Sequence, residues 1–534
     1  RVTLGGDLTR TRAWVFFPKN DLNWYSSPRT NSGTIDEARY HADRWTADYL
    51  GNYAVDMSPT LRADLSAGFQ TLITRTDRVD ASGVGLVANA ARSVGAASER
   101  TGTQSVGQNI SNGVLGQVQL SHRDRLYVQL AGRLDRNSAF GAESKYFFSP
   151  RVGASYVLSD ESFWQNSGLG SAVNTFRLRA AYGTTGRSPT TGALATYDPD
   201  VYVLPASAAI QPGVTPQNPG NSALKPERGT ELEAGFEAGL LNDRLSLEVT
   251  YFNKKTNDAI LERPIAPSLG FDDDPFVNIG EIVNRGLEIS ATARILTLPQ
   301  LGWETNLTFN TLHNEVTDLG DVDPFGTQYR TREGAPVGSF HTYVVRSVDV
   351  ANNVAIVSND LEFVGNVLPG WEGTFGSTVN FLGNFTAYAQ LDFRGDVYRY
   401  EGSAQFRDRQ FRNSANWVFR NDTTFMSAEE RLRRFGPFKK ENGETITFGN
   451  VGGAYIEDAS FLRLREVSLS YRIPESFAAR FMRARDASIS VAGRNLAVWT
   501  GYSGLDPETI YASNTEFFTV PADRRFLLRV SASY

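Results

Sequence analysis

The side chains that could carry catalysis or bind a metal ion are few in this sequence. Cysteine is absent, which excludes disulfides, thiolate ligands and cysteine nucleophiles together. The four histidines lack the spacing of a metal site: His41, His122, His313 and His341. Ser222 and Lys225 fit an S-x-x-K pattern, but that chemistry needs a helix, and Pro226 favours an extended backbone. The sequence therefore gives no support to an enzyme, a metal centre or a cofactor.

A run of three aspartates, Asp272 to Asp274, lies in a stretch that we expect to be a loop. Oxygen-rich loops can bind calcium, but the ligands of known loop sites alternate with other residues, and these aspartates are consecutive. A solvated acidic turn is the simpler interpretation, and calcium binding stays an open alternative.

The richest candidate for ligand recognition is the stretch 397–460, in which aromatic residues are interleaved with arginines. Aromatic faces beside hydrogen-bond donors suit sugar rings or peptide chains. We predict that the following residues bind substrate: Tyr398, Tyr400, Arg407, Trp417 and Phe419. The alternative is that these rings pack the loop against itself. Ser427 and Glu430 form a capping-box pattern, which predicts a short surface helix in the same stretch.

The charge of the chain excludes some partners. The 534 residues have a formal net charge of -6, which gives no reason to expect nucleic acid. Acidic and basic residues are nearly balanced within 397–460, which argues against selection of a strongly charged ligand. Mean hydropathy is -0.32, and no apolar run reaches about 18 residues, so helical membrane spans are not expected.

A two-residue alternation recurs along the whole chain and predicts the elements that position these residues. In the terminal FLLRVSASY, Phe526 and Leu528 fall on one side of an extended backbone and Arg529 on the other. About sixteen such segments occur, most about ten residues long, the length that a tilted strand needs to cross a bilayer. They start near residues 2, 42, 61, 111, 125, 149, 175, 228, 244, 283, 303, 371, 384, 461, 487 and 525. In FLRLREVSLSY the phase changes between Leu464 and Val467, which predicts a β-bulge.

The connections between these segments alternate between short and long. Tight turns are predicted at these positions: 56–59, 122–124, 240–244, 298–302 and 381–384. From residue 228 onward the long connections become longer along the chain, and the longest has roughly 60 residues or more. An outer-membrane β-barrel shows this asymmetry, with short periplasmic turns and long extracellular loops. The connection 159–174 is an exception, being longer on the side predicted to be periplasmic. The alternative is a soluble protein of several β-sandwiches.

Several stretches resemble the SusC/RagA-type family of TonB-dependent outer-membrane transporters. The family's R-x-D-x-S-x-x-F-G connection is filled here by Arg133, Asp135, Ser138, Phe140 and Gly141. FRLRAAYGTTGRSP (176–189) is similar to LR-x-S-Y-G-x-T-G-N, although Arg187 replaces the usual asparagine. NSALKPE (221–227) and GLDPE (504–508) match two further motifs. The resemblance covers most of the chain from residue 111 onward.

The resemblance implies a barrel of about 22 strands with a plugged lumen. The family has an N-terminal plug preceded by a TonB box. Because the chain shows neither of them and fewer strands, we expect residues 1–534 to be the C-terminal part of one barrel domain. The resemblance further implies active import of a large nutrient, an oligosaccharide or peptide.

The partners implied by the resemblance are a SusD-like surface lipoprotein, the TonB complex (reached through the missing N-terminal segment) and outer-membrane lipid. Two alternatives stay open. One is a passive porin-like or structural barrel of about sixteen strands, a size known for porins. The other is a surface adhesin.

Overall fold

The computed structural model describes residues 1–19, 32–141, 146–189, 198–205, 210–271, 273–326, 328–410, 426–447, 451–510 and 515–533. It consists predominantly of antiparallel strands. Two compact units are distinguished. Unit 1 comprises Arg1–Ala154, Tyr182–Thr230 and Asn257–Ile279, and unit 2 comprises Ser155–Ala181, Glu231–Thr256 and Gly280–Tyr534.

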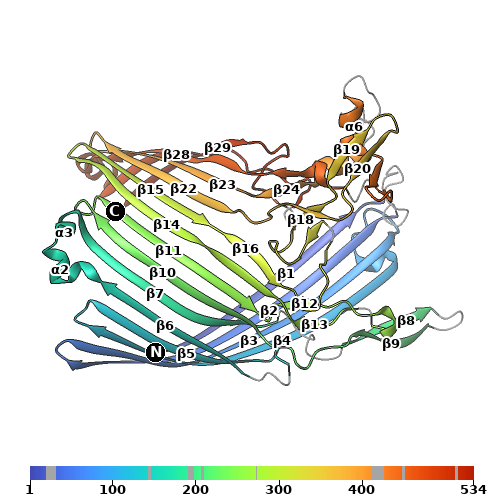
Figure 1. Ribbon diagram of the computed structural model, residues 1–534, viewed down its shortest axis with the longest axis horizontal. Helices are drawn as coiled ribbons and strands as arrows, with labels where there is room; N and C mark the ends of the chain where they lie inside the picture. Colours follow the sequence, from blue (N-terminus) through green and yellow to red (C-terminus); the bar gives the residue numbers. More distant parts are fainter. Residues whose placement is uncertain are drawn as a thin grey trace. The chain divides into compact units, whose positions relative to one another are not determined.

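Seventeen strands belong to one hydrogen-bonded sheet (Figure 1). Their bounds are β1 (Val2–Phe17), β2 (Thr34–Ser58), β3 (Leu61–Leu86), β4 (Ala97–His122), β5 (Leu126–Asn137), β6 (Phe147–Val157), β7 (Val173–Arg187), β10 (Glu227–Leu240), β11 (Leu245–Asn257), β14 (Glu281–Leu298), β15 (Leu301–Thr311), β16 (His313–Asp318), β22 (Trp371–Phe381), β23 (Phe385–Gly395), β28 (Phe461–Ile473), β29 (Asp486–Thr500) and β31 (Arg525–Ser533). Each segment predicted by the alternation corresponds to one of these strands. The sheet contains one strand that the alternation does not predict, β16, which follows β15 directly and pairs with β14.

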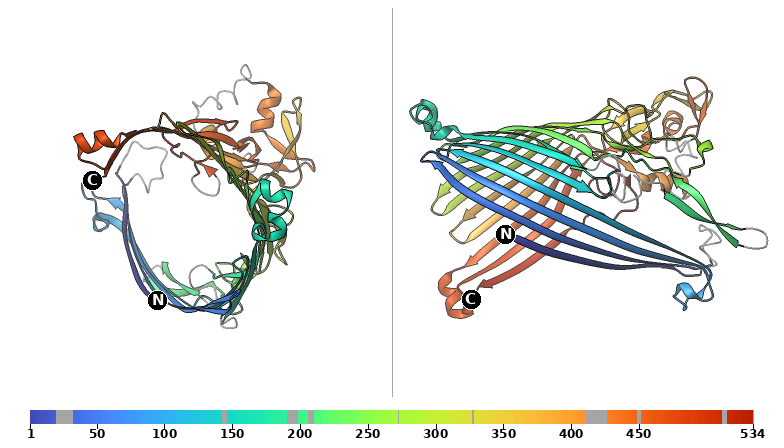
Figure 2. Two further views of the ribbon diagram at one scale, coloured as in Figure 1. Left: turned by 90° about the vertical axis from the view of Figure 1, so that its left-hand side faces the viewer. Right: turned by 90° about the horizontal axis from the view of Figure 1, so that it is seen from below.

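The longest strands lie in unit 1, where β1 to β4 pair antiparallel in sequence order and form the long blue ribbons of Figure 2. The predicted length of about ten residues is wrong for three of them, since β2 has 25 residues and β3 and β4 have 26 each. The predicted starts near residues 42 and 111 are also late, since β2 begins at Thr34 and β4 at Ala97. Apolar alternation indicates only the part of a strand that faces hydrocarbon, whereas the hydrogen-bonded ladder continues into polar sequence, as in the pairing of Arg78 with Ser105.

The two faces of the sheet in unit 1 differ in polarity. Leu65, Val118 and Leu130 lie opposite one another on β3, β4 and β5, and their exposed fractions are 38%, 36% and 53%. On the other face, the Arg133 Nε donates to Asp135 Oδ1 at 2.8 Å. A row of exposed large apolar side chains is unfavourable in water and favourable against lipid, so the apolar face is the outer wall of a membrane barrel.

In unit 2 the strands are joined by tight turns where the sequence predicts them. The turn between β10 and β11 places Leu241, Asn242 and Asp243 in the left-handed region, with φ of 56°, 58° and 59°. Asn and Asp tolerate this conformation better than most residues. The predicted bulge in β28 is also confirmed, because the pairing with β29 shifts between Leu464 and Glu466.

The remaining strands lie in the long connections. They are β8 (Asp198–Pro205), β9 (Ile210–Asn218), β12 (Ile260–Glu262), β13 (Phe276–Asn278), β17 (Tyr329–Arg330), β18 (Ser339–Thr342), β19 (Val345–Asp349), β20 (Val354–Val357), β21 (Glu362–Gly365), β24 (Tyr398–Glu401), β25 (Phe438–Lys440), β26 (Thr445–Ile446), β27 (Ile456–Asp458) and β30 (Thr515–Glu516). The described parts of the long connections are therefore folded.

In the part of the chain that the structure describes, helical segments are short. The α-helices are α2 (Ser162–Gln165), α3 (Gly168–Ala172), α4 (Gly402–Gln410), α6 (Ala428–Phe435) and α7 (Glu475–Phe477). Single 3₁₀ or π turns are η1 (Val94–Ala96), η2 (Leu158–Asp160), η3 (Pro267–Leu269), η5 (Gly453–Tyr455) and η6 (Ala478–Met482). The longer connection predicted at 159–174 contains η2, α2 and α3. Within the described ranges, no helix has the length and apolar character needed to span a membrane.

Candidate functional site

The long connections of unit 2 fold into three small sheets. One sheet contains β17, β18 and β21, a second β19, β20, β25 and β26, and a third β24, β27 and β30. In the third sheet, β24 pairs antiparallel with β27 and parallel with β30. Since β30 comes from the connection before the last strand, this sheet holds two long loops together.

Apolar side chains stabilise these loops. Ala355, Leu432 and Phe438 belong to one buried cluster, which places one side of α6 against β20 and β25. Helix α6 begins as the capping box predicts, because the Ser427 hydroxyl accepts a hydrogen bond from the Glu430 N–H at 3.1 Å. The loops are thus packed on cores of their own.

The five residues predicted to bind substrate do not share one environment. Tyr400 is buried in a loop core, with its ring 6.3 Å from that of Tyr455. Tyr398 lies two residues earlier on β24 and is half-buried, while Arg407 is exposed on α4. Trp417 and Phe419 lie outside the described residues. Their roles in binding stay a prediction.

Three carboxylates gather in the third loop sheet. Glu401 on β24 lies directly across from Glu516 on β30, and Glu457 lies on the adjacent strand β27. Glu401 and Glu516 have exposed fractions of only 6% and 0%. Glu516 Oε1 accepts a hydrogen bond from the Ser403 hydroxyl at 2.8 Å. Among the described residues, however, no group of three or more His, Cys, Asp or Glu side chains could hold a metal ion.

Ser503 joins two of these carboxylates. Its N–H lies 2.8 Å from Glu457 Oε2, and its hydroxyl oxygen lies 2.8 Å from Glu457 Oε1 and 3.1 Å from Glu401 Oε2. A serine hydroxyl has one proton to donate. Both carboxylates therefore accept from the same hydroxyl, and Ser503 links Glu401 to Glu457.

Burial raises the pKa of Glu401 above its ordinary value, and the nearby carboxylate of Glu457 raises it further. Arg407 acts in the opposite direction, but it is exposed and does not cancel the effect. Burial also raises the pKa of Tyr502, next to the same carboxylates. The cluster thus favours the protonated form of Glu401 more than bulk water does.

A cavity of about 580 Å³ opens beside this cluster. Its lining includes Tyr343, Glu430, Arg433, Glu457 and Ser503. Pockets of about 300–1,000 Å³ suit small ligands. Among the described residues that line it, none is one of the five predicted from the aromatic pattern.

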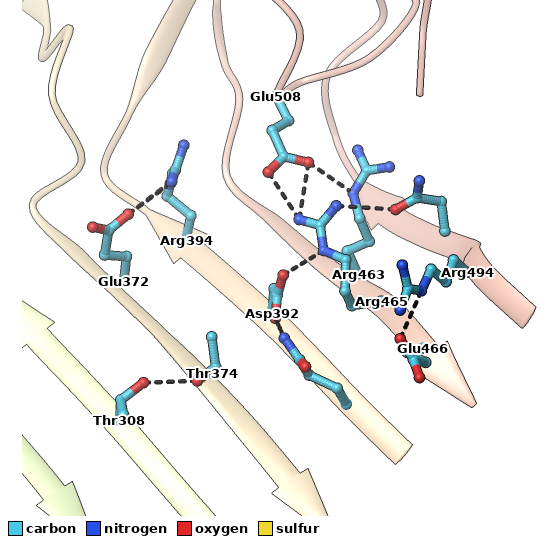
Figure 3. Close-up of polar contacts among 12 residues, drawn as sticks. Thr308, Glu372, Thr374, Asp392, Arg394, Arg463, Arg465, Glu466, Arg494 and Glu508 are labelled. Carbon is cyan, nitrogen blue, oxygen red and sulfur yellow. Dashed lines mark hydrogen bonds and ion pairs between the residues drawn. The ribbon is translucent and has the colours of Figure 1, made fainter. Parts of the chain in front are cut away.

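A second polar cluster fixes the segment that follows β29 (Figure 3). Arg465, the residue at the bulge of β28, donates from Nη2 to both oxygens of Glu508 at 2.8 and 3.0 Å and from Nη1 to Asn495. Its Nε also donates to Asp392. Bulges re-aim side chains, and here the bulge lets Arg465 reach across to the loop.

The neighbouring Arg463 completes this cluster. Its Nη2 donates to Asp506 at 2.6 Å, and both side chains are almost fully buried. Asp506 and Glu508 are the charged residues of the GLDPE motif. The sequence singles the motif out by resemblance, but its arginine partners more than 40 residues away carry no local signal.

These observations define a class: an outer-membrane β-barrel protein whose long loops contain small sheets of their own. The model of the family described as TonB dependent receptor-like, beta-barrel matches residues 1–496. The chain therefore belongs to the TonB-dependent receptor-like β-barrel family.

Relatives of known sequence agree with this assignment. TonB-dependent receptor P26 of Formosa agariphila is 26% identical over 434 residues, covering 74% of this chain and 42% of that protein. SusC of Bacteroides thetaiotaomicron is 22% identical over 458 residues, covering 78% and 43%. The chain thus spans less than half the length of these relatives.

Solved structures show the same fold. A structure of the RagAB peptide transporter matches all of this chain and 60% of its own, with a TM-score of 0.78 and 20% identity. The RagAB peptide importer in its closed-closed state gives a TM-score of 0.80 at the same identity and coverage. The matched relatives are named as receptors and transporters.

Proposed function

We propose that this chain is part of an active importer in the outer membrane, and that it is not an enzyme. The cargo is a nutrient too large for ordinary porins, an oligosaccharide or a peptide. The observation that carries the proposal is the match of residues 1–496 to the TonB-dependent receptor barrel. The folded loops of unit 2, with a cavity among them, supply a place for the cargo to bind.

The rest of the transporter is inferred from the relatives. Residues 1–534 form the C-terminal part of one barrel domain, and a plug and a TonB box belong to the preceding part of a longer polypeptide. The coverage of 42% to 43% of two curated relatives supports this division. Movement of the plug, driven by the TonB complex, would release the cargo into the periplasm.

Partner proteins follow from the same relatives. A SusD-like surface lipoprotein would cap the extracellular loops, as the resemblance of the sequence motifs to the SusC/RagA type implies. The loop residues predicted from the sequence, Tyr398, Tyr400, Arg407, Trp417 and Phe419, stay proposed contacts to the cargo. A passive porin-like barrel is the second candidate, because about sixteen strands suffice for a porin.

Uptake measurements in living cells test the proposal. A deletion strain would be compared with its parent for uptake of labelled oligosaccharides and peptides, each with and without TonB. Active import predicts that uptake of one class is lost in the deletion strain and in the strain without TonB. A porin predicts loss in the deletion strain alone, and an adhesin predicts no change in either strain. The last two results would contradict the importer.

A further inference from the structure

The loop cavity of unit 2 combines charges of both signs with an apolar lining. Its volume is about 580 Å³. Glu430, Arg433 and Arg434 reach it from α6, and Glu457 reaches it from β27. These two acidic and two basic side chains balance, so the cavity carries separated charges with no net charge.

The acidic side chain of β27 is held in one orientation. Both oxygens of Glu457 accept hydrogen bonds from Ser503, one from its N–H and one from its hydroxyl, each at 2.8 Å. These two hydrogen bonds hold both oxygens of the carboxylate in place. A preorganised carboxylate of this kind suits an ammonium group.

The basic side chains lie on α6. Arg433 is paired with Glu429 at 3.1 Å, but both side chains are at least half exposed, and such pairs stabilise little. Arg433 can therefore exchange Glu429 for the carboxylate of a ligand at small cost. The guanidinium of Arg434 lies 5.9 Å from the Tyr455 ring centroid, which restricts its position.

Between these charges the lining is partly apolar, with Val345, Val364 and Val451 among its residues. We propose that the cavity binds a short zwitterionic peptide, with Glu457 facing its free ammonium group and Arg433 and Arg434 facing its carboxylate. This inference rests on the proposed import function and names peptide as the substrate class. A neutral oligosaccharide has no charged ends to pair with Glu457 or Arg433, so it would gain less from this lining.

The test uses the purified protein in detergent and four ligands of similar length. Tetra-alanine has both charged ends, N-acetyl-tetra-alanine lacks the ammonium group, tetra-alanine amide lacks the carboxylate, and maltotetraose lacks both. Isothermal titration calorimetry gives each affinity. We expect tetra-alanine to bind, each blocked peptide to bind on the order of tenfold more weakly, and maltotetraose to bind weakest.

Two variants assign each end of the peptide to a wall of the cavity. Glu457→Gln should bind tetra-alanine and its N-acetyl form equally, while it still prefers a free carboxylate. Arg433→Gln should show a smaller preference for the free carboxylate and keep the preference for the free amine. The matched controls, Glu441→Gln and Lys439→Gln, change charges outside the cavity lining and should behave as the unaltered protein.

Equal affinity of the unaltered protein for free and blocked peptides would overturn this inference, as would stronger binding of maltotetraose. Since the comparison of ligands needs no substitution, a variant that misfolds does not obscure the result. A protein that binds maltotetraose and takes it up with TonB would still be an importer, so the proposed function and this inference can fail separately.

Discussion

At the scale of single residues, protonation of Glu401 affects the stability of the folded loop. Glu401 is buried beside Glu457, and Ser503 contacts both. Because the pKa of Glu401 is raised in the folded loop, the folded state binds this proton more tightly than the unfolded state does. The stabilisation is fully present below the ordinary pKa of 4.5 and is lost as the pH rises through the raised value.

Glu401→Gln tests this proton directly. The amide cannot ionise, so the third loop sheet should become less sensitive to pH, with a gain of about 1 kcal/mol at pH 8 and little change at pH 5. Hydrogen exchange of the amides in 398–401 and 456–458 measures the local free energy of opening. Glu444→Gln, at an exposed glutamate outside the cluster, is the control. An equal effect at both pH values would contradict the protonation argument.

Arg465 is the second residue whose role can be isolated. Arg465→Lys keeps the charge but loses the two-pronged contact with Glu508, so we expect the segment 501–510 to open about 2 kcal/mol more easily. Hydrogen exchange of that segment measures the change. Arg494→Lys alters an exposed pair with Glu466 and should have little effect. If both variants lower the free energy of opening by the same amount, Arg465 stabilises the segment no more than an exposed arginine does.

The residues of the cavity could not be found from the sequence. Glu457 and Ser503 are 46 residues apart, and each is an ordinary polar residue in its local context. The aromatic pattern of the loop instead indicated Tyr398 and Tyr400, of which Tyr400 packs in a loop core. An aromatic side chain suits a ligand or a core equally well, and only the tertiary contacts distinguish the two.

At the scale of elements, the strands and turns were predictable because their signals are local. Alternation within each strand and short polar turns between strands located the sheet, and the change of phase after Leu464 located the bulge. The lengths of β2 to β4 were missed because ladder hydrogen bonds extend beyond apolar sequence. The loop sheets were missed because pairs such as β24 and β30 join residues more than 100 positions apart.

Helix α6 offers a test of local sequence control. Ser427→Ala removes the acceptor for the Glu430 N–H, and we expect the helix to lose about 1 kcal/mol of stability. Ser427→Asp supplies another acceptor and should retain it. Exchange rates of the amides in 428–435 report the difference. If Ser427→Ala leaves these rates unchanged, packing of Leu432 rather than the cap holds the helix.

At the scale of the whole molecule, insertion in the membrane depends on which face of the sheet meets lipid. Val118 and Gln119 are neighbours on β4, so their side chains point to opposite faces. Val118→Arg places a charge among Leu65 and Leu130 on the apolar face and should destabilise the protein by about 2–4 kcal/mol near the bilayer midplane. Gln119→Arg points to the polar lumen and should cost little. Urea unfolding of both variants in lipid vesicles measures the two costs, and equal values would mean that the apolar face does not contact lipid.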